Sequence, residues 1–223
     1  MKTKENSGKK LLIIGIMLLM AFAVWTYLIQ TVDVQPVGQN GTVVGFAELN
    51  CKFHTLTGVH MKLYTITDWL GLVPVFVCII FSIIGLVQLI KRKSIFNVDK
   101  DIIFLGIYYI IVVFFYIIFE MFPINYRPIL IEEVLEASYP SSTTILVLSV
   151  MPTLVYQADK RLKIVAFKKY VCIFSILFSL FMVIGRMLSG VHWLTDIIGA
   201  VLLSFGLYFL YKASVLLWHK KEI

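Results

Sequence analysis

Two residues in the last fifth of the sequence have a spacing that suits proton or phosphoryl transfer. His192 and Asp196 are four positions apart, and residues at i and i+4 share one face of a helix. A carboxylate placed there can accept a hydrogen bond from one imidazole nitrogen, which leaves the other nitrogen free as a base, a nucleophile or a ligand. A structural polar pair at a helix start is the simpler alternative. A metal site is less well supported, because no second His or Cys lies nearby at ligand spacing.

Groups that can bind an anion occur in three other segments. Arg127 and Arg186 carry guanidiniums, which suit bidentate contacts with phosphate, although a single arginine at a membrane rim can also reach lipid headgroups. Ser141 and Ser142 follow Pro140 at an expected helix start, where free backbone N–H groups attract anions. A serine there can equally be an ordinary helix cap. Together with an oriented imidazole, these groups are what phosphoryl transfer through a His nucleophile needs.

The composition indicates that membrane helices position these residues. Of the 223 residues, 60% are hydrophobic and 15% are charged, whereas a soluble domain is about 45–50% apolar and about 25% charged. This balance excludes a soluble globular protein, a disordered chain and a secreted disulfide scaffold. The three cysteines are also too few and too scattered for a disulfide framework or a metal site.

Six apolar runs predict six transmembrane helices, because backbone polar groups cannot stay unpaired in lipid. The predicted spans cover residues 11–30, 69–90, 102–121, 141–157, 170–187 and 193–217. The first is longer than the apolar part of a signal peptide, so we interpret it as an uncleaved anchor. The sequence therefore predicts an all-α, six-helix integral membrane bundle, with residues 1–223 as a single domain. Residues 31–68 form the longest connection, predicted as a loop or short hairpin followed by an interfacial helix over 53–69.

The distribution of positive charge predicts the orientation of the bundle. Of the 20 Lys and Arg residues, all but Lys52, Lys62, Arg127 and Arg186 fall on one side of the predicted spans. Because cytoplasmic loops carry the excess of basic residues, we expect both termini in the cytoplasm. The net charge of +7 then indicates contact with anionic lipid heads rather than nucleic acid. The same topology brings the candidate site residues to the outer face.

With these motifs the sequence resembles the type-2 phosphatidic acid phosphatase superfamily of integral membrane lipid phosphatases. The family's third motif, S-R-x5-H-x3-D, reads Gly185-Arg186-x5-His192-x3-Asp196 here. The first motif, K-x6-R-P, reads Glu120-x6-Arg127-Pro128, and the second, P-S-G-H, reads Pro140-Ser141-Ser142-Thr143. The third motif is fairly specific in this context, whereas the first two are degraded.

The resemblance implies a role for each matching residue. His192 is the expected nucleophile, which forms a phospho-histidine, and Asp196 orients and polarises it. Arg127, Arg186 and Ser141 are expected to hold phosphate oxygens, with Ser142 beside them. Neither a metal nor an organic cofactor is implied, because the guanidiniums and helix N–H groups can neutralise the phosphate.

Two of the family's functional residues are replaced in this chain. Glu120 stands where the family has a phosphate-binding Lys, and Thr143 stands where it has the His that protonates the leaving group. In one interpretation the substrate is a lipid diphosphate, whose leaving group needs little protonation. In a second, a protonated carboxyl of Glu120, Glu132 or Glu133 supplies the proton. In a third, the protein binds a lipid phosphate without hydrolysing it.

We expect, from these observations, hydrolysis of a lipid-linked phosphate or diphosphate at the extracytoplasmic membrane face. A small transporter is the rival of a different class, but transporters place polar sites near the bilayer midplane, and here the polar residues lie at one rim. The small size of the chain favours a bacterial plasma membrane. The expected partners are the lipid substrate and the bilayer, and the sequence indicates no oligomeric state.

Overall fold

Each of the six predicted spans falls on a long α-helix of the computed structural model, which describes residues 2–218, although the first helix begins nine residues before its predicted span. The helices are α1 (Lys2–Thr31), α4 (Leu72–Arg92), α5 (Lys100–Met121), α6 (Ser142–Arg161), α7 (Val165–Leu188) and α8 (Leu194–Trp218). Within the described residues, β-pairing is limited to isolated bridges. The prediction of an all-α membrane bundle is therefore confirmed.

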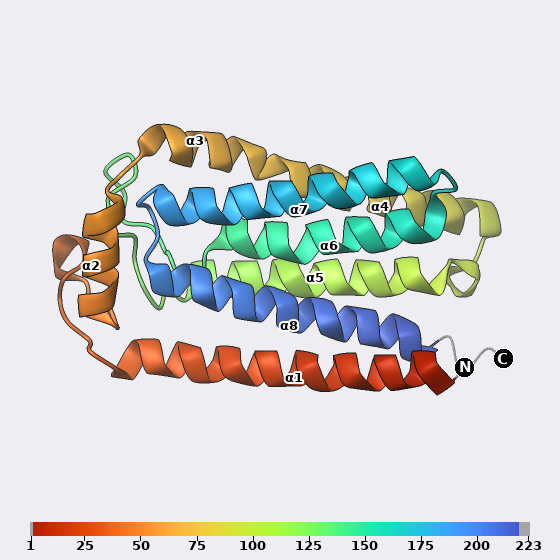
Figure 1. Cartoon of the computed structure of the whole chain (residues 1–223), viewed down its shortest axis with the longest axis horizontal. Helices are drawn as coiled ribbons and strands as arrows, with labels where there is room; N and C mark the ends of the chain where they lie inside the picture. Colours follow the sequence, from red (N-terminus) through yellow and green to blue (C-terminus); the bar gives the residue numbers. More distant parts are fainter. Residues whose placement is uncertain (1, 219–223) are drawn as a thin grey trace.

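Five helical segments are long and apolar enough to cross a membrane, and α6 is not among them. In the bundle, α6 lies between α5 and α7 (Figure 1) and packs against α4, α5, α7 and α8. Because its neighbours shield it from lipid, α6 can carry buried polar side chains such as Thr144, Ser149 and Gln157. The number of membrane crossings thus stays a prediction.

The outer connection differs from the single interfacial helix predicted over 53–69. It contains two helices, α2 (Ala47–Thr57) and α3 (Met61–Leu70). Gly58 ends α2 with φ at 69°, a conformation that favours glycine. Helix α3 then runs on in line with α4, while α2 lies across the end of the bundle (Figure 1). The predicted short hairpin is present as a bridge between Gln35 and Val44.

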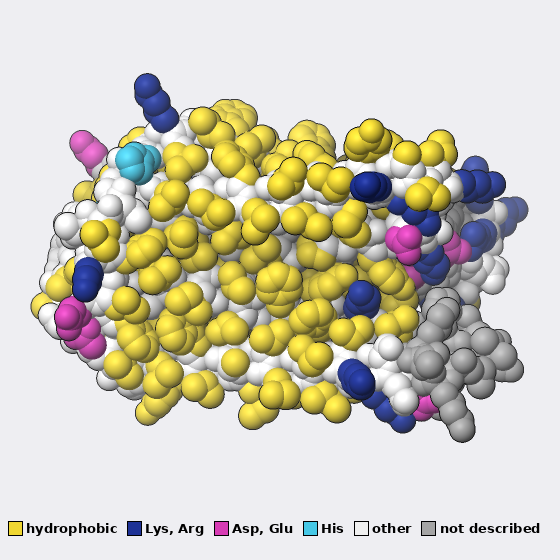
Figure 2. Space-filling model, in the orientation of Figure 1, with side chains coloured by type: hydrophobic (Ala, Val, Ile, Leu, Met, Phe, Trp, Pro, Cys, Tyr) yellow, Lys and Arg dark blue, Asp and Glu magenta, His cyan; other side chains and the backbone are white. Residues whose placement is uncertain are grey.

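The two ends of the bundle differ in charge. The start of α1 and the end of α8 lie at the same end (Figure 1), and Lys and Arg side chains gather there, whereas hydrophobic side chains cover the middle (Figure 2). At that end Asp101, 2% exposed, pairs with Lys160 at 2.8 Å and with Arg161 at 2.7 Å. Lys220 and Lys221, which also entered the orientation argument, lie outside the described residues. The arrangement agrees with the predicted orientation, and the sidedness stays a prediction.

Helices α1 and α8 approach closely along their length. A Cβ atom at Gly206 would lie 2.8 Å from Leu19 Cδ2, and one at Gly15 would lie 3.1 Å from the Gly206 carbonyl oxygen. Small residues at such crossings let two helix backbones pack tightly in a membrane. This packing holds α8 in place, and the N-terminal turn of α8 carries one part of the candidate site.

Candidate active site

His192 lies in the short connection between α7 and α8 and is 3% exposed. Its Nδ1 is 3.1 Å from the Ser138 carbonyl oxygen. Because a carbonyl can only accept, we assign the proton to Nδ1, which leaves the lone pair on Nε2. Nε2 accepts a hydrogen bond from Arg186 Nη2 at 3.3 Å. Burial, together with the positive charges of Arg186 and Arg127, lowers the pKa of His192 well below its usual value. The imidazole is therefore neutral near pH 7 and can act as a nucleophile.

Asp196 does not hold the imidazole in the way that its spacing predicts. The distance from its Oδ2 to His192 Nδ1 is 3.6 Å, which is too long for a hydrogen bond. Oδ2 instead accepts from the Trp193 backbone N–H at 2.9 Å, and Oδ1 accepts from Asn125 Nδ2 at 3.4 Å. A side chain at the third position of a helix commonly bonds the N–H at its cap. The carboxylate thus holds the turn that carries His192, and Ser138 takes the orienting contact.

Three other elements fix this turn through Thr195 and Trp193. Asn50 of α2 donates to Thr195 Oγ1 at 3.0 Å and accepts from its N–H at 3.3 Å. Trp25 of α1 donates to the Thr195 carbonyl at 3.1 Å, and Trp193 Nε1 donates to the Tyr126 carbonyl at 2.8 Å. Sequence reasoning missed all of these contacts, because their partners are far apart along the chain and follow no motif.

Helix α3 reaches Arg186 because α7 has a glycine at the contact. A Cβ atom at Gly185 would lie 2.6 Å from Thr67 Cγ2, so the serine found in the family's motif would clash there. The close packing of α3 on α7 brings Tyr64, about one turn before Thr67, and Asp68, the residue after it, to the guanidinium of Arg186. The replacement of the motif serine by Gly185 therefore has a structural reason.

Arg127 and Arg186 both approach the ring of Tyr64. Their Cζ atoms lie 5.5 and 5.0 Å from the centre of the Tyr64 ring, a distance at which cations are attracted to aromatic rings. Arg127 pairs with Glu136 at 3.0 Å, and Arg186 approaches Asp68 at 3.5 Å. Both arginines are buried, at 7% and 1% exposed.

Several N–H groups of these arginines have no acceptor. Among the described residues, Nε of both side chains and Nη1 of Arg127 make no hydrogen bond. A buried donor without a partner costs about 1–3 kcal/mol. Both arginines also line the cavity described below, so a movement of their side chains toward an anion there would supply the missing acceptors.

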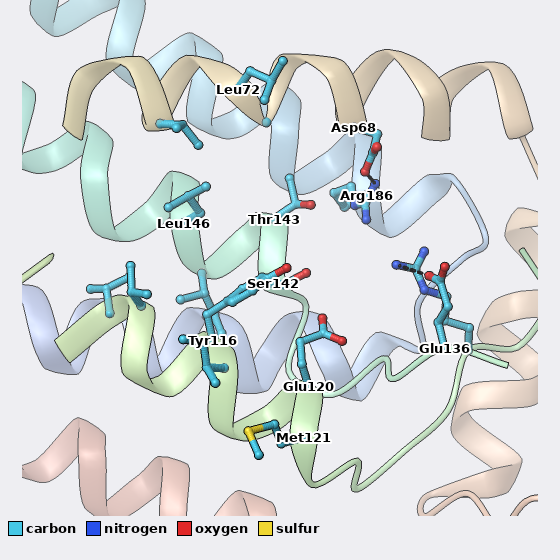
Figure 3. A pocket seen from close by; sticks show the side chains of 17 residues that line it. Asp68, Leu72, Tyr116, Glu120, Met121, Glu136, Ser142, Thr143, Leu146 and Arg186 are labelled. Atoms are coloured by element: carbon cyan, nitrogen blue, oxygen red, sulfur yellow. Dashed lines mark hydrogen bonds and ion pairs between the residues drawn. The ribbon is translucent and has the colours of Figure 1, made fainter. Parts of the chain in front are cut away.

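The arginines open into a cavity of about 750 Å³ between α3, α4, α5, α6 and α7 (Figure 3). Its outer part is polar. The polar lining consists of Asp68, Glu120, Arg127, Glu136, Ser142, Thr143 and Arg186. Deeper along the helices the lining is apolar and includes Leu72, Val75, Val113, Ile117 and Leu146. The cavity thus has a polar part that suits a charged headgroup and an apolar part that suits a lipid tail.

The structure divides the predicted site residues into two groups. Arg127, Ser142, Arg186, Glu120 and Thr143 line the cavity. Behind its wall lie His192, Asp196 and Ser141, all buried. Arg186 joins the groups, because it lines the cavity and contacts His192 Nε2. The Ser141 hydroxyl accepts from Thr144 Oγ1 at 3.0 Å.

Glu132 and Glu133 lie in an exposed turn, outside the cavity lining. Of the three carboxyls considered from the sequence as proton donors, the structure thus places only Glu120 in the cavity.

Comparison with known proteins places this helical membrane protein in a family. Residues 107–220 match the PAP2 superfamily, and the chain belongs to it. Comparison with curated protein sequences finds no significant match. The fold is similar to the crystal structure of the first transmembrane PAP2 type phosphatidylglycerolphosphate phosphatase from Bacillus subtilis. That chain is 20% identical, with a TM-score of 0.64, and the similarity covers 94% of this chain and 96% of that one. The family identified from the motifs is confirmed.

Proposed function

We propose that this protein hydrolyses a lipid-linked phosphate or diphosphate at the extracytoplasmic face of the membrane, through a phospho-histidine on His192. One observation carries the proposal. A neutral imidazole presents Nε2 to Arg186, which lines an amphipathic cavity together with Arg127, and three buried N–H-bearing nitrogens of these two arginines have no acceptor among the described residues. Membership of the PAP2 superfamily supports phosphatase activity on a membrane lipid.

The geometry suggests how the reaction proceeds. Phosphate oxygens would accept from the free N–H groups of Arg127 and Arg186 and from the N-terminus of α6 beside Ser142. Arg186 Nη2 must then leave His192 Nε2, so that the lone pair can attack phosphorus. The bond from phosphorus to the lipid oxygen breaks, and the phosphate stays on Nε2 until water removes it. Ser138 continues to accept the Nδ1 proton and stabilises the positive charge on the ring.

The apolar part of the cavity supports a lipid as the substrate. Its walls come from α4, α5 and α6, and a separate apolar hollow of about 410 Å³ lies between α4 and α5, lined by Phe81, Gly85, Gly106 and Ile110 among others. A lipid tail can stay among these side chains while the headgroup reaches the arginines. A soluble phosphate ester would leave this apolar surface empty.

Release of inorganic phosphate from a panel of lipid phosphates by the purified protein tests the proposal. The panel contains phosphatidic acid, an isoprenyl diphosphate and a single-chain lipid phosphate. We expect turnover of at least one of them. If none is hydrolysed while the protein still binds these lipids, the protein is a lipid-phosphate binder and the proposed activity is wrong.

The pH dependence of kcat is expected to lack a step near pH 6.5. The pKa of His192 lies well below that value because burial and two arginines disfavour the imidazolium. The nucleophile therefore stays neutral as the pH falls from about 8 to about 6, whereas a free imidazole with a pKa of about 6.5 would be mostly protonated at the lower end of this range. Measuring kcat at saturating substrate across this range checks the expectation, and a loss of activity centred near pH 6.5 would contradict it.

Restoring the family's histidine with Thr143→His is expected to increase hydrolysis of phosphatidic acid by about 10²-fold, the low end for general acid catalysis. Thr143 lines the cavity, so an imidazole there can reach a leaving oxygen. The rate with an isoprenyl diphosphate should change little, because its leaving group is already good. Thr143→Gln, of similar size but without a titratable proton, is the control. An equal gain with both variants would show that shape, rather than acid catalysis, limits the rate.

A further inference from the structure

Three carboxylates line the candidate cavity, and two of them lie outside the family's motifs. Asp68 of α3, Glu120 of α5 and Glu136 of the loop before α6 all line it, together with the guanidiniums of Arg127 and Arg186. Figure 3 shows the three acidic side chains directed toward the same hollow. Only Glu120 stands at a motif position, and there the family has a lysine.

Two of these carboxylates are already paired. Glu136 contacts Arg127 and Asp68 approaches Arg186, so these charges cancel in pairs. Glu120 is attracted by the charge of Arg127, but within residues 2–218 it makes no hydrogen bond or ion pair. With all three carboxyls ionised, the cavity lining carries a surplus of one negative charge, and a phosphate dianion would raise the surplus to three. Like charges repel strongly where water is partly excluded.

Arg127 and Arg186, which both line this cavity, also carry buried N–H groups without an acceptor. In a phosphatase site that also holds an ionised carboxylate without an ion-pair partner, a positive charge on the ligand itself would offset the repulsion between that carboxylate and the phosphate. Tyr116 lies one turn before Glu120 on α5 and also lines the cavity. An aromatic ring beside a carboxylate is well suited to an organic ammonium group.

We propose that the substrate is a lipid phosphate that carries an ammonium group close to its phosphate, and that Glu120 binds this ammonium beside Tyr116. The proposal rests on the proposed function, because it assigns a substrate class to the same cavity. Within residues 2–218 no three His, Cys, Asp or Glu side chains come together closely enough to hold a metal ion. The carboxylates are spread around the cavity, as suits a ligand with two separated charges.

An ammonium at this position also accounts for the loss of the family's general acid. As His192 Nε2 forms its bond to phosphorus, the electron pair of the breaking phosphorus–oxygen bond moves to the lipid oxygen. The neighbouring ammonium transfers a proton to that oxygen, giving an alcohol and a neutral amine, and the amine regains a proton from water. Thr143 then has no proton to supply, and a single substrate explains both replaced motif residues.

The test compares two lipids that differ only in this charge. Purified full-length protein is assayed in EDTA with a long-chain 2-aminoalkyl phosphate and with its N-acetylated analogue, and inorganic phosphate is measured. We expect kcat/KM to be at least about 10-fold higher for the amine, the factor that one or two hydrogen bonds to a charged group would give. Equal or reversed values would overturn the substrate class and leave the phosphatase proposal intact. Failure to hydrolyse any lipid phosphate would overturn both.

Replacement of Glu120 separates the ammonium-binding role from two alternatives. Glu120→Gln should bring the amine and N-acetyl lipids to similar kcat/KM, and Glu120→Lys should favour the N-acetyl lipid. Glu132→Gln, on the exposed turn outside the cavity, is the matched control and should keep the wild-type preference. Equal loss of turnover on both lipids in Glu120→Gln would identify Glu120 as the proton donor and refute the proposal. Hydrolysis of the N-acetyl lipid that rises to the rate of the amine when Mg²⁺ is added would refute it in favour of a metal ion.

Discussion

Replacing His192 with asparagine is expected to lower the rate of lipid phosphate hydrolysis by at least about 10⁴-fold, because the covalent intermediate can no longer form. The asparagine amide can still donate to the Ser138 carbonyl, so the turn before α8 should keep its shape. The enzyme would retain its arginines and its cavity, and lipid binding should stay within a few-fold of wild type. Phosphate release under saturating lipid gives the rate, and quenching in alkali traps the phospho-histidine of the wild type.

His60→Gln is the matched control for this experiment. His60 lies at the same end of the bundle as His192, where its backbone N–H donates to the Ser189 carbonyl, but it is exposed, and its ring nitrogen contacts the Thr57 carbonyl. We expect its activity to stay near that of wild type. If His192→Asn retains substantial activity, or if radiolabelled phosphate never appears on the wild-type protein, the reaction does not pass through this histidine.

Arg186→Lys is expected to cost about 10²–10³-fold in kcat/KM, the range found when one preorganised donor to the transition state is removed. The substitution keeps the positive charge but loses the planar group that lines the cavity and also donates to His192 Nε2. A lysine ammonium cannot offer the same parallel N–H groups to a phosphate. The larger part of the loss should fall on kcat, because the contact matters most as charge builds on the phosphoryl group.

Arg161→Lys provides the comparison at the opposite end of the bundle. Arg161 also pairs with two carboxylates, those of Asp99 and Asp101, at 3.1 and 2.7 Å. Its replacement should lower the thermal stability of the bundle while leaving kcat/KM close to wild type. If the two variants lose activity in parallel with stability, the role of Arg186 is structural and not catalytic.

The outer segment shows where pattern reasoning stops. The mixture of polar and apolar residues over 53–69 has the composition of an interfacial helix, and it gives no sign that α3 continues α4. That continuation depends on the packing of Thr67 against Gly185. The neighbouring contact between Asp68 and Arg186 joins residues that are 118 positions apart in the sequence. No local propensity encodes such a contact, because its energy arises only when α7 is in place.

From the sequence alone one can determine the helical membrane bundle, the family and the residues of its three motifs, since hydropathy and fixed spacing survive in the linear order of residues. The tertiary structure decides which residues form hydrogen bonds and ion pairs with the site residues. It directs the Nδ1–H of His192 to the Ser138 carbonyl oxygen rather than to Asp196, and it brings Asp68 and Glu136 to the arginines. These choices depend on distances of a few tenths of an ångström between segments that the sequence separates, and hydrogen bonds and ion pairs change strength over that range.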